Sequence, residues 1–279
     1  MKNLIYLFVL TFLMSSCTEN IDFDLNSEKS RLVVEGEITT GKAKHVVKLT
    51  QSTSYYYSEE APLVTNAAVS LSDGTNSWTL TEEKPGYYYT PEIIGQPNLT
   101  YTLSVNDNGT TYSASDFMVA PVIADSLAVV VTESFDQEKN ILVDAYSLFL
   151  FVEEPVGLGD NYIWKYWLKT PDSAWKNMTP NFEDWVVAND EYVDGNAPEG
   201  GWELFADIPL EEMPTGTQVR LEMYKISTPY YDFLNAIALQ TQRSGFFDGP
   251  PANIPGNISE GALGFFSSSA VDSVSTVVK

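Results

Sequence analysis

Side chains that could perform catalysis are scarce in this sequence. The chain of 279 residues contains one His and one Cys, which excludes multi-His metal sites, intramolecular disulfides and Cys-based zinc sites. A Ser-His-Asp triad would have to use His45. Because Lys44 and Val46 flank this histidine in a strand-like segment, we expect it to be an ordinary sheet residue. The sequence also lacks a nucleophile elbow, a phosphate-binding loop and a dinucleotide fingerprint.

Paired carboxylates are the remaining route to catalysis, since a glycosidase places two Asp or Glu side chains around the scissile bond. Adjacent residues of a strand point to opposite faces of a sheet, so neighbouring acids rarely form such a pair. We therefore predict that the protein is not an enzyme, with a carboxylate-based glycosidase as the alternative. The acidic doublets are Glu59-Glu60, Glu82-Glu83, Glu153-Glu154 and Glu211-Glu212.

The acidic segment 189–196 resembles a calcium-binding loop. Its spacing differs from that of an EF-hand, because Tyr192 occupies the third ligand position. A looser site could use the carboxylates of Asp190 and Asp194 together with backbone carbonyl groups, and the alternative is an acidic surface turn. We expect no cofactor, with a structural calcium ion as the alternative.

Aromatic side chains in loop-like segments give the strongest indication of binding. Exposed aromatic rings stack on sugars or fill protein interfaces, whereas rings that cover a sheet only stabilise the fold. We predict that a glycan ligand, a peptide ligand or a partner protein contacts some of these rings. The candidates are Tyr55, Tyr56 and Tyr57, which follow a strand, and Trp175, Trp185 and Trp202 in the loop-rich segment 171–214.

The charge of the chain narrows the choice of partner. It has 38 Asp and Glu against 15 Lys and Arg, a formal net charge of −23. Binding to phosphate backbones requires clustered basic residues, so nucleic acid is excluded as a partner. The chain is not a disordered acidic tail either, because 44% of its residues are hydrophobic.

The N-terminus reads as a lipoprotein signal peptide, residues 1–16. Lys2 precedes an apolar run from Leu4 to Met14, which is too short to cross a bilayer. The run ends in small residues directly before Cys17, which predicts a lipobox and a lipid on this cysteine; an ordinary secretory signal is the alternative. Several acyl chains would hold the protein on a membrane. Residues 17–30 form an acidic tether. Its residues Glu19, Asp22 and Asp24 resemble the export signal of surface-exposed Bacteroidetes lipoproteins, which favours a position facing the cell surface; a solvated acidic linker is the alternative.

Three serines follow an aspartate and precede a small apolar residue, a pattern similar to the O-glycosylation signal of exported Bacteroidetes proteins. They are Ser126, Ser173 and Ser273.

The fold is predicted to be mostly β. Short alternating segments in residues 31–120 predict an immunoglobulin-like antiparallel β-sandwich, with hairpin turns at Asp73-Gly74 and Asn108-Gly109. Residues 121–279 form a second β-rich region with one amphipathic helix at about 229–243, capped by Thr228, and a last strand at 270–278.

The ensemble of motifs resembles the domain of unknown function 4249 family, a group of Bacteroidetes outer-membrane lipoproteins. The resemblance implies an immunoglobulin-like N-terminal region and a partnership with a TonB-dependent outer-membrane transporter, and it implies no established activity. Its most specific part is the run 250–266, which we interpret as a structural loop over the helix with Leu263, Phe265 and Phe266 buried; a ligand-binding loop is the alternative. The other matching segments are the lipobox at Cys17, Glu19 to Asp24, 32–38, 67–73 and 86–88.

The sequence therefore predicts a non-enzymatic, lipid-anchored accessory or capture subunit of a TonB-dependent nutrient transporter. Two alternatives stay open. The protein could bind glycans at the surface without a transporter, or it could be an adhesin or fimbrial-type subunit, a class that also uses lipidated β-sandwiches.

Overall fold

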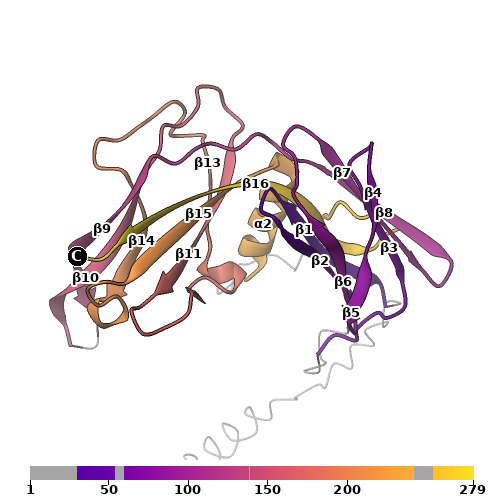
Figure 1. Ribbon diagram of the computed structural model, residues 1–279, viewed down its shortest axis with the longest axis horizontal. Coiled ribbons are helices and arrows are strands. Elements are labelled where there is room, and N and C mark those ends of the chain that lie inside the picture. Colours follow the sequence, from indigo (N-terminus) through magenta and orange to yellow (C-terminus); the bar gives the residue numbers. More distant parts are fainter. Residues whose placement is uncertain (1–29, 54–59, 138, 242–253) are drawn as a thin grey trace, which may run out of the picture. The chain divides into compact units, whose positions relative to one another are not determined.

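The computed structural model describes residues 30–53, 60–137, 139–241 and 254–279. Strands dominate these residues, and the helix in them lies close to the C-terminus (Figure 1). This confirms the expected mostly-β fold of antiparallel sheets. Cys17 and Tyr55 to Tyr57 lie outside the described residues. In the part of the chain that the structure describes, no helix is long and apolar enough to cross a membrane.

The largest sheet has nine strands, in the order β12-β11-β15-β16-β1-β2-β6-β5, with β13 also paired to β11. Its pairs are antiparallel except for β1 and β16, which run parallel. The strands are β1 (Leu32–Thr39), β2 (Ala43–Gln51), β5 (Thr81–Lys84), β6 (Tyr87–Ile93), β11 (Asn161–Lys169), β12 (Lys176–Asn177), β13 (Val186–Asn189), β15 (Gln218–Ile226) and β16 (Leu263–Val277).

A four-stranded sheet of order β4-β3-β7-β8 shares a hydrophobic core with β1 and β2 of the large sheet. Asn108 and Gly109 adopt positive φ in the turn between β7 and β8, as the predicted hairpin requires. Alternate residues such as Leu71 and Leu103 point into this core, where Leu49 meets them. The strands are β3 (Ala68–Ser72), β4 (Ser77–Thr79), β7 (Thr100–Asp107) and β8 (Thr110–Phe117).

Strand β16 belongs to both β-rich regions. Residues 263–269 pair with β1 and residues 270–277 pair with β15, and Phe266 lies in the first core (Figure 1). The strand begins at Leu263, well before the predicted start at residue 270. Its first half contains one Gly and three consecutive Ser and lacks a period of two in hydrophobicity, so alternation could not reveal it.

The Asn/Gly/Pro run before β16 is held by backbone hydrogen bonds. The side-chain amide of Asn257 donates to the carbonyl oxygen of Phe266 (2.8 Å) and accepts its N–H (2.9 Å). Gly264 has a φ of +93°, and a Cβ there would collide with the carbonyl oxygen of Val34. The described part of the run before Leu263 is therefore a structural connection. The expected loop is wrong from Leu263 onward, where β16 begins, and Leu263 is half-buried, whereas Phe265 and Phe266 are buried as predicted.

Helix α2 (Thr228–Thr241) packs on β16 through aromatic rings. The ring of Phe265 lies 5.0 Å from that of Tyr230 and 5.1 Å from that of Phe233. Ser227 caps the helix, because its hydroxyl group accepts the N–H of Tyr230 (3.3 Å). The expected cap at Thr228 is therefore one residue too late, and positions 242 and 243 of the predicted helix lie outside the described residues.

A three-stranded sheet of order β14-β10-β9 covers the face of β11 and β15 that points away from α2. Tyr162, Tyr166 and Leu168 of β11 meet Leu148 and Leu150 of β10 in this second core. Strand β14 lies within the segment that the sequence indicated to be loop-rich. The elements are β9 (Ser126–Asp136), β10 (Ile141–Phe151), β14 (Trp202–Pro209) and the short 3-10 helices η1 (Phe182–Asp184) and η2 (Leu210–Glu212).

Candidate functional site

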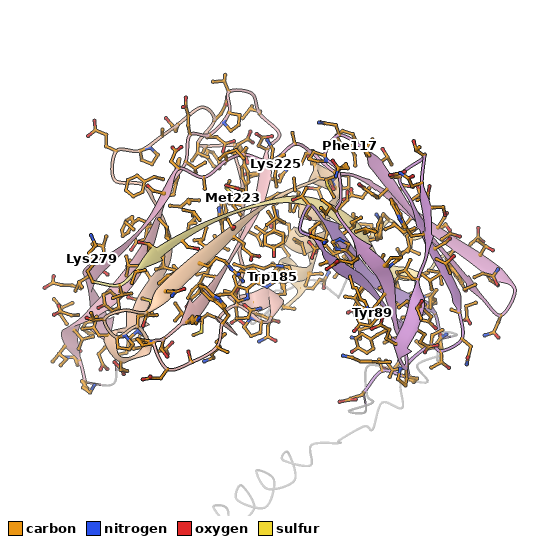
Figure 2. The ribbon with its side chains drawn as sticks, viewed as in Figure 1. Tyr89, Phe117, Trp185, Met223, Lys225 and Lys279 are labelled. Carbon is orange, nitrogen blue, oxygen red and sulfur yellow. The ribbon has the colours of Figure 1, made fainter. Side chains whose placement is uncertain are left out.

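Trp185 follows η1 and is fixed by its own hydrogen bond. Its indole N–H donates to the carbonyl oxygen of Thr179 (3.1 Å), and its ring meets the edge of Phe182 at 5.8 Å. The 3-10 turn that presents it is closed by Asn181, whose N–H donates to Asp184 (3.1 Å). Figure 2 labels this tryptophan among the side chains near β11 and α2. Its orientation is therefore set before any ligand arrives.

Lys165 of β11 lies beneath this ring. Its ammonium nitrogen is 3.7 Å from the centre of the Trp185 ring and 4.4 Å from the centre of the Tyr224 ring. Lys165 is only 8% exposed, and no ion pair joins it to another described residue. Burial lowers the pKa of Lys165, while the negative charges of Glu37 and Glu222 oppose the shift in part. A cation held mainly by aromatic rings supports the Trp185 platform from behind.

Arg220 of β15 lies between two further tryptophans. The centre of its guanidinium group is 5.0 Å from the Trp167 ring and 4.9 Å from the Trp175 ring. Its Nε is 3.3 Å from a carboxylate oxygen of Glu222. Trp175 keeps 38% of its surface exposed. This cation–π contact restrains an indole that stays partly exposed.

The strand register brings these side chains to one surface of the large sheet. Residues 165 and 167 of β11 are paired with 222 and 220 of β15, so all four point to the same face. We call this surface the tryptophan face and define it by Lys165, Trp167, Trp175, Trp185 and Arg220.

A groove lies beside Trp185, between η1, β13 and the second half of α2. Its volume is about 560 Å³, within the range of small-ligand sites, roughly 300–1,000 Å³. Its lining combines apolar side chains with polar side chains that can form hydrogen bonds to a ligand. The lining residues are Phe182, Glu183, Trp185, Val187, Leu234, Asn235, Ala238, Leu239 and Thr241.

The structure separates the predicted aromatic contacts. Trp175 and Trp185 share the tryptophan face, where Trp185 is half-buried against an apolar cluster that contains Ile163 and Leu234. Trp202 instead begins β14 and packs against the second core, where it pairs with Leu150. Lys165, Trp167 and Arg220 were not among the sequence candidates. A lysine in the centre of the aromatic strand 162–168 is the sequence signal that could have indicated them.

The two predicted calcium ligands hold a glycine-containing loop. Asp190 is buried, and its carboxylate accepts the N–H groups of Gly159 (2.9 Å) and Asp160 (3.0 Å). The carboxylate of Asp194 accepts the N–H of Gly157 (2.6 Å). Both aspartates therefore fix the connection between β10 and β11.

Asp190 is grouped with two other carboxylates rather than with Asp194. Ligand atoms of Glu154, Asp160 and Asp190 lie within 4.8 Å of one another. The ammonium group of Lys225, labelled in Figure 2, is 2.6 Å from Asp160. The hydroxyl group of Tyr162 lies 3.1 Å from Glu154, and burial raises the pKa of that glutamate. The ammonium group of Lys225 thus neutralises part of the negative charge of this acidic cluster.

The three serines of the glycosylation-like pattern are all exposed. Ser126 begins β9, Ser173 lies in a turn where its hydroxyl accepts the N–H of Thr170 (3.0 Å), and Ser273 lies in β16. The neighbouring Asp272 has a structural contact, because its carboxylate accepts the N–H of Ala124 (2.8 Å).

Comparison with known proteins gives a family and no activity. A family model described as "Domain of unknown function (DUF4249)" matches residues 18–275. A search of curated proteins found no match.

Proposed function

The chain belongs to the DUF4249 family, and we propose that it is a non-enzymatic, lipid-anchored outer-membrane protein that captures a nutrient for a TonB-dependent transporter. The predicted lipobox supports the anchor, and the family resemblance supports the transporter. The tryptophan face and its groove support the capture of a ligand, for which we propose a glycan.

The observation that carries the proposal is the fixed orientation of Trp185 and Trp175. A hydrogen bond and a buried lysine hold Trp185, and Arg220 holds Trp175. Rings that are already ordered lose little conformational entropy when a ligand binds. Flat indole surfaces stack on the apolar faces of sugar rings. These side chains would therefore bind a saccharide at low entropic cost.

The groove adds hydrogen-bonding groups to the stacking surface. Glu183, Asn235 and Thr241 line it together with apolar side chains of η1, β13 and α2. Sugar hydroxyl groups need such partners once they leave water. The combination suits a short segment of a glycan better than a purely apolar ligand.

Affinity electrophoresis through gels that contain soluble polysaccharides tests glycan capture. We expect one class of polysaccharide to retard the wild-type protein and the Trp175→Ala variant to lose at least about tenfold in affinity. Tyr192→Ala is the matched control, since Tyr192 is 86% exposed and lies outside the tryptophan face. Equal retardation of both variants would rule out this surface as the glycan site.

A second experiment distinguishes a transporter subunit from a glycan-binding protein that acts alone. The full-length lipidated protein is purified from its native membrane in a gentle detergent. Our proposal predicts that one large outer-membrane barrel protein co-purifies in a fixed ratio. A lipoprotein that migrates alone and still binds glycan would support the stand-alone alternative.

A further inference from the structure

Strand β9 forms an edge of the three-stranded sheet. In the described part of the chain it pairs only with β10, although it is 11 residues long. Edge strands are usually protected from other chains by Lys, Pro or a short length. Between Ser126 and Asp136 the sequence contains neither Lys, Arg nor Pro. Strand β16 lies close to β9 without pairing to it, and Leu127 and Val129 at the beginning of β9 share the second core with Val274 of β16. The unpaired side of β9 is therefore a template for another strand along its second half, where Val131 and Phe135 are exposed.

One face of the β9–β10 ribbon changes from buried to exposed along its length. The cross-strand pair of Leu127 and Leu150 lies in the second core. The same face continues towards the turn, where Phe135 is paired with Leu142. Phe135 is 54% exposed and Leu142 is 61% exposed, and Val131, on the same face, is 53% exposed. These three side chains form an apolar strip beyond the core.

Two carboxylates interrupt this strip. Glu133 lies directly opposite Asp144 in the β9–β10 register, and both are exposed. Like charges in opposite positions destabilise a sheet. Neither has an ion pair among the described residues, whereas Asp136 nearby is paired with Lys139 (2.8 Å). The ribbon thus presents unmatched negative charge between apolar side chains.

We propose that β9 is the docking strand for an extended, basic segment of a partner protein. The segment adds to the free edge of β9 by backbone hydrogen bonds. It places Lys or Arg beside Glu133 and Asp144, and apolar side chains beside Val131 and Phe135. This proposal does not depend on whether the tryptophan face binds a glycan.

The same charges disfavour a second copy of this chain as the occupant. A homodimer through β9 would bring two pairs of carboxylates to one interface, each in a molecule with a net charge of −23. Like-charge repulsion of this kind opposes association. A basic partner matches both the charge and the apolar strip.

A peptide probe tests the proposal on the full chain. The probe is a fluorescent ten-residue peptide of alternating Val and Thr with two central Lys, compared with the same peptide carrying Glu in place of Lys. Fluorescence anisotropy should show that the basic peptide binds at least about tenfold more tightly than the acidic one. Hydrogen exchange should show that the basic peptide protects the amides of residues 126–136.

The double variant Glu133→Gln/Asp144→Asn should weaken binding of the basic peptide by about tenfold. Because the substitutions remove the repulsion, the melting temperature of the double variant should equal or exceed that of the wild type. A loss of binding would therefore not reflect unfolding. Glu203→Gln is the matched control, because Glu203 lies on β14 at the other edge of this sheet. The proposal is overturned if the basic peptide does not bind, if the double variant binds it undiminished, or if sedimentation shows a wild-type dimer in which the amides of residues 126–136 are protected from exchange.

Discussion

The ammonium nitrogen of Lys165 lies 3.7 Å from the centre of the Trp185 ring, and this lysine is only 8% exposed. Attraction between the cation and the ring offsets part of the cost of removing the charge from water. We therefore expect that Lys165 orients Trp185 and lowers the free energy of unfolding. This relationship leads to a prediction about stability.

The Lys165→Met variant should be more stable than the wild type at pH 7, by about 1 kcal/mol. Because the pKa of Lys165 is lowered from 10.5, the unfolded wild type binds more protons than the folded one between that lowered pKa and 10.5. The stability of the wild type therefore rises with pH across this window, and the advantage of the variant should shrink. Urea unfolding of both proteins at neutral and alkaline pH measures this. An advantage that does not change with pH would contradict it.

His45 should stay neutral at pH 7 and make the protein sensitive to acid. Burial lowers its pKa from 6.5, although Glu37 and the backbone of Ile93 oppose the shift. The unfolded chain then binds more protons below pH 6.5, so stability is lost as the pH falls through this value. Since this is the only histidine, its imidazole signals in an NMR titration report the pKa directly. A measured value above 6.5 would contradict the expectation.

The Lys225→Met variant should be destabilised by about 3 kcal/mol at pH 7. The substitution removes the cation that lies 2.6 Å from Asp160 and leaves three carboxylates close together. Protonation of these groups at acidic pH should relieve the repulsion and reduce the loss. Lys44→Met is the matched control, because its ion pair with Glu83 is exposed and should contribute little. Equal effects of the two substitutions in thermal unfolding would contradict a buried network.

The Gly264→Ala variant should be destabilised by more than about 2 kcal/mol. Its Cβ would collide with the carbonyl oxygen of Val34, in the parallel pairing that joins β16 to β1. Gly74→Ala is the control for backbone strain, since Gly74 has a similar φ of +88° and open space around it. That control should lose only about 1 kcal/mol. If both variants unfold at the same denaturant concentration, the close approach of β16 to β1 does not make a substitution at Gly264 more destabilising than one at Gly74.

Most strands were predictable from the sequence because their residues alternate between core and surface. The hairpin at Asn108-Gly109 is one example, since its turn residues also favour positive φ. Strand β14 was missed although Trp202, Leu204, Ala206 and Ile208 recur with a period of two, because Phe205 interrupts the alternation and the pairing with β10 is irregular. The first half of β16 was hidden by its serines, which are buried through long-range pairing with β1.

The candidate site was predictable in part. Trp175 and Trp185 were found by their residue type and their place in a loop-rich segment. The cations behind them, Lys165 and Arg220, depend on the register between β11 and β15. A local pattern cannot supply that register, because the two strands are far apart in the sequence.

The most direct test of the account is the affinity of the wild-type protein and its Trp175→Ala variant for the polysaccharide that retards it most. The account predicts that the variant loses at least about tenfold in affinity, while Tyr192→Ala binds as the wild type does. A Trp175→Ala variant that binds the same polysaccharide as tightly as the wild type would contradict the claim that the tryptophan face captures the ligand.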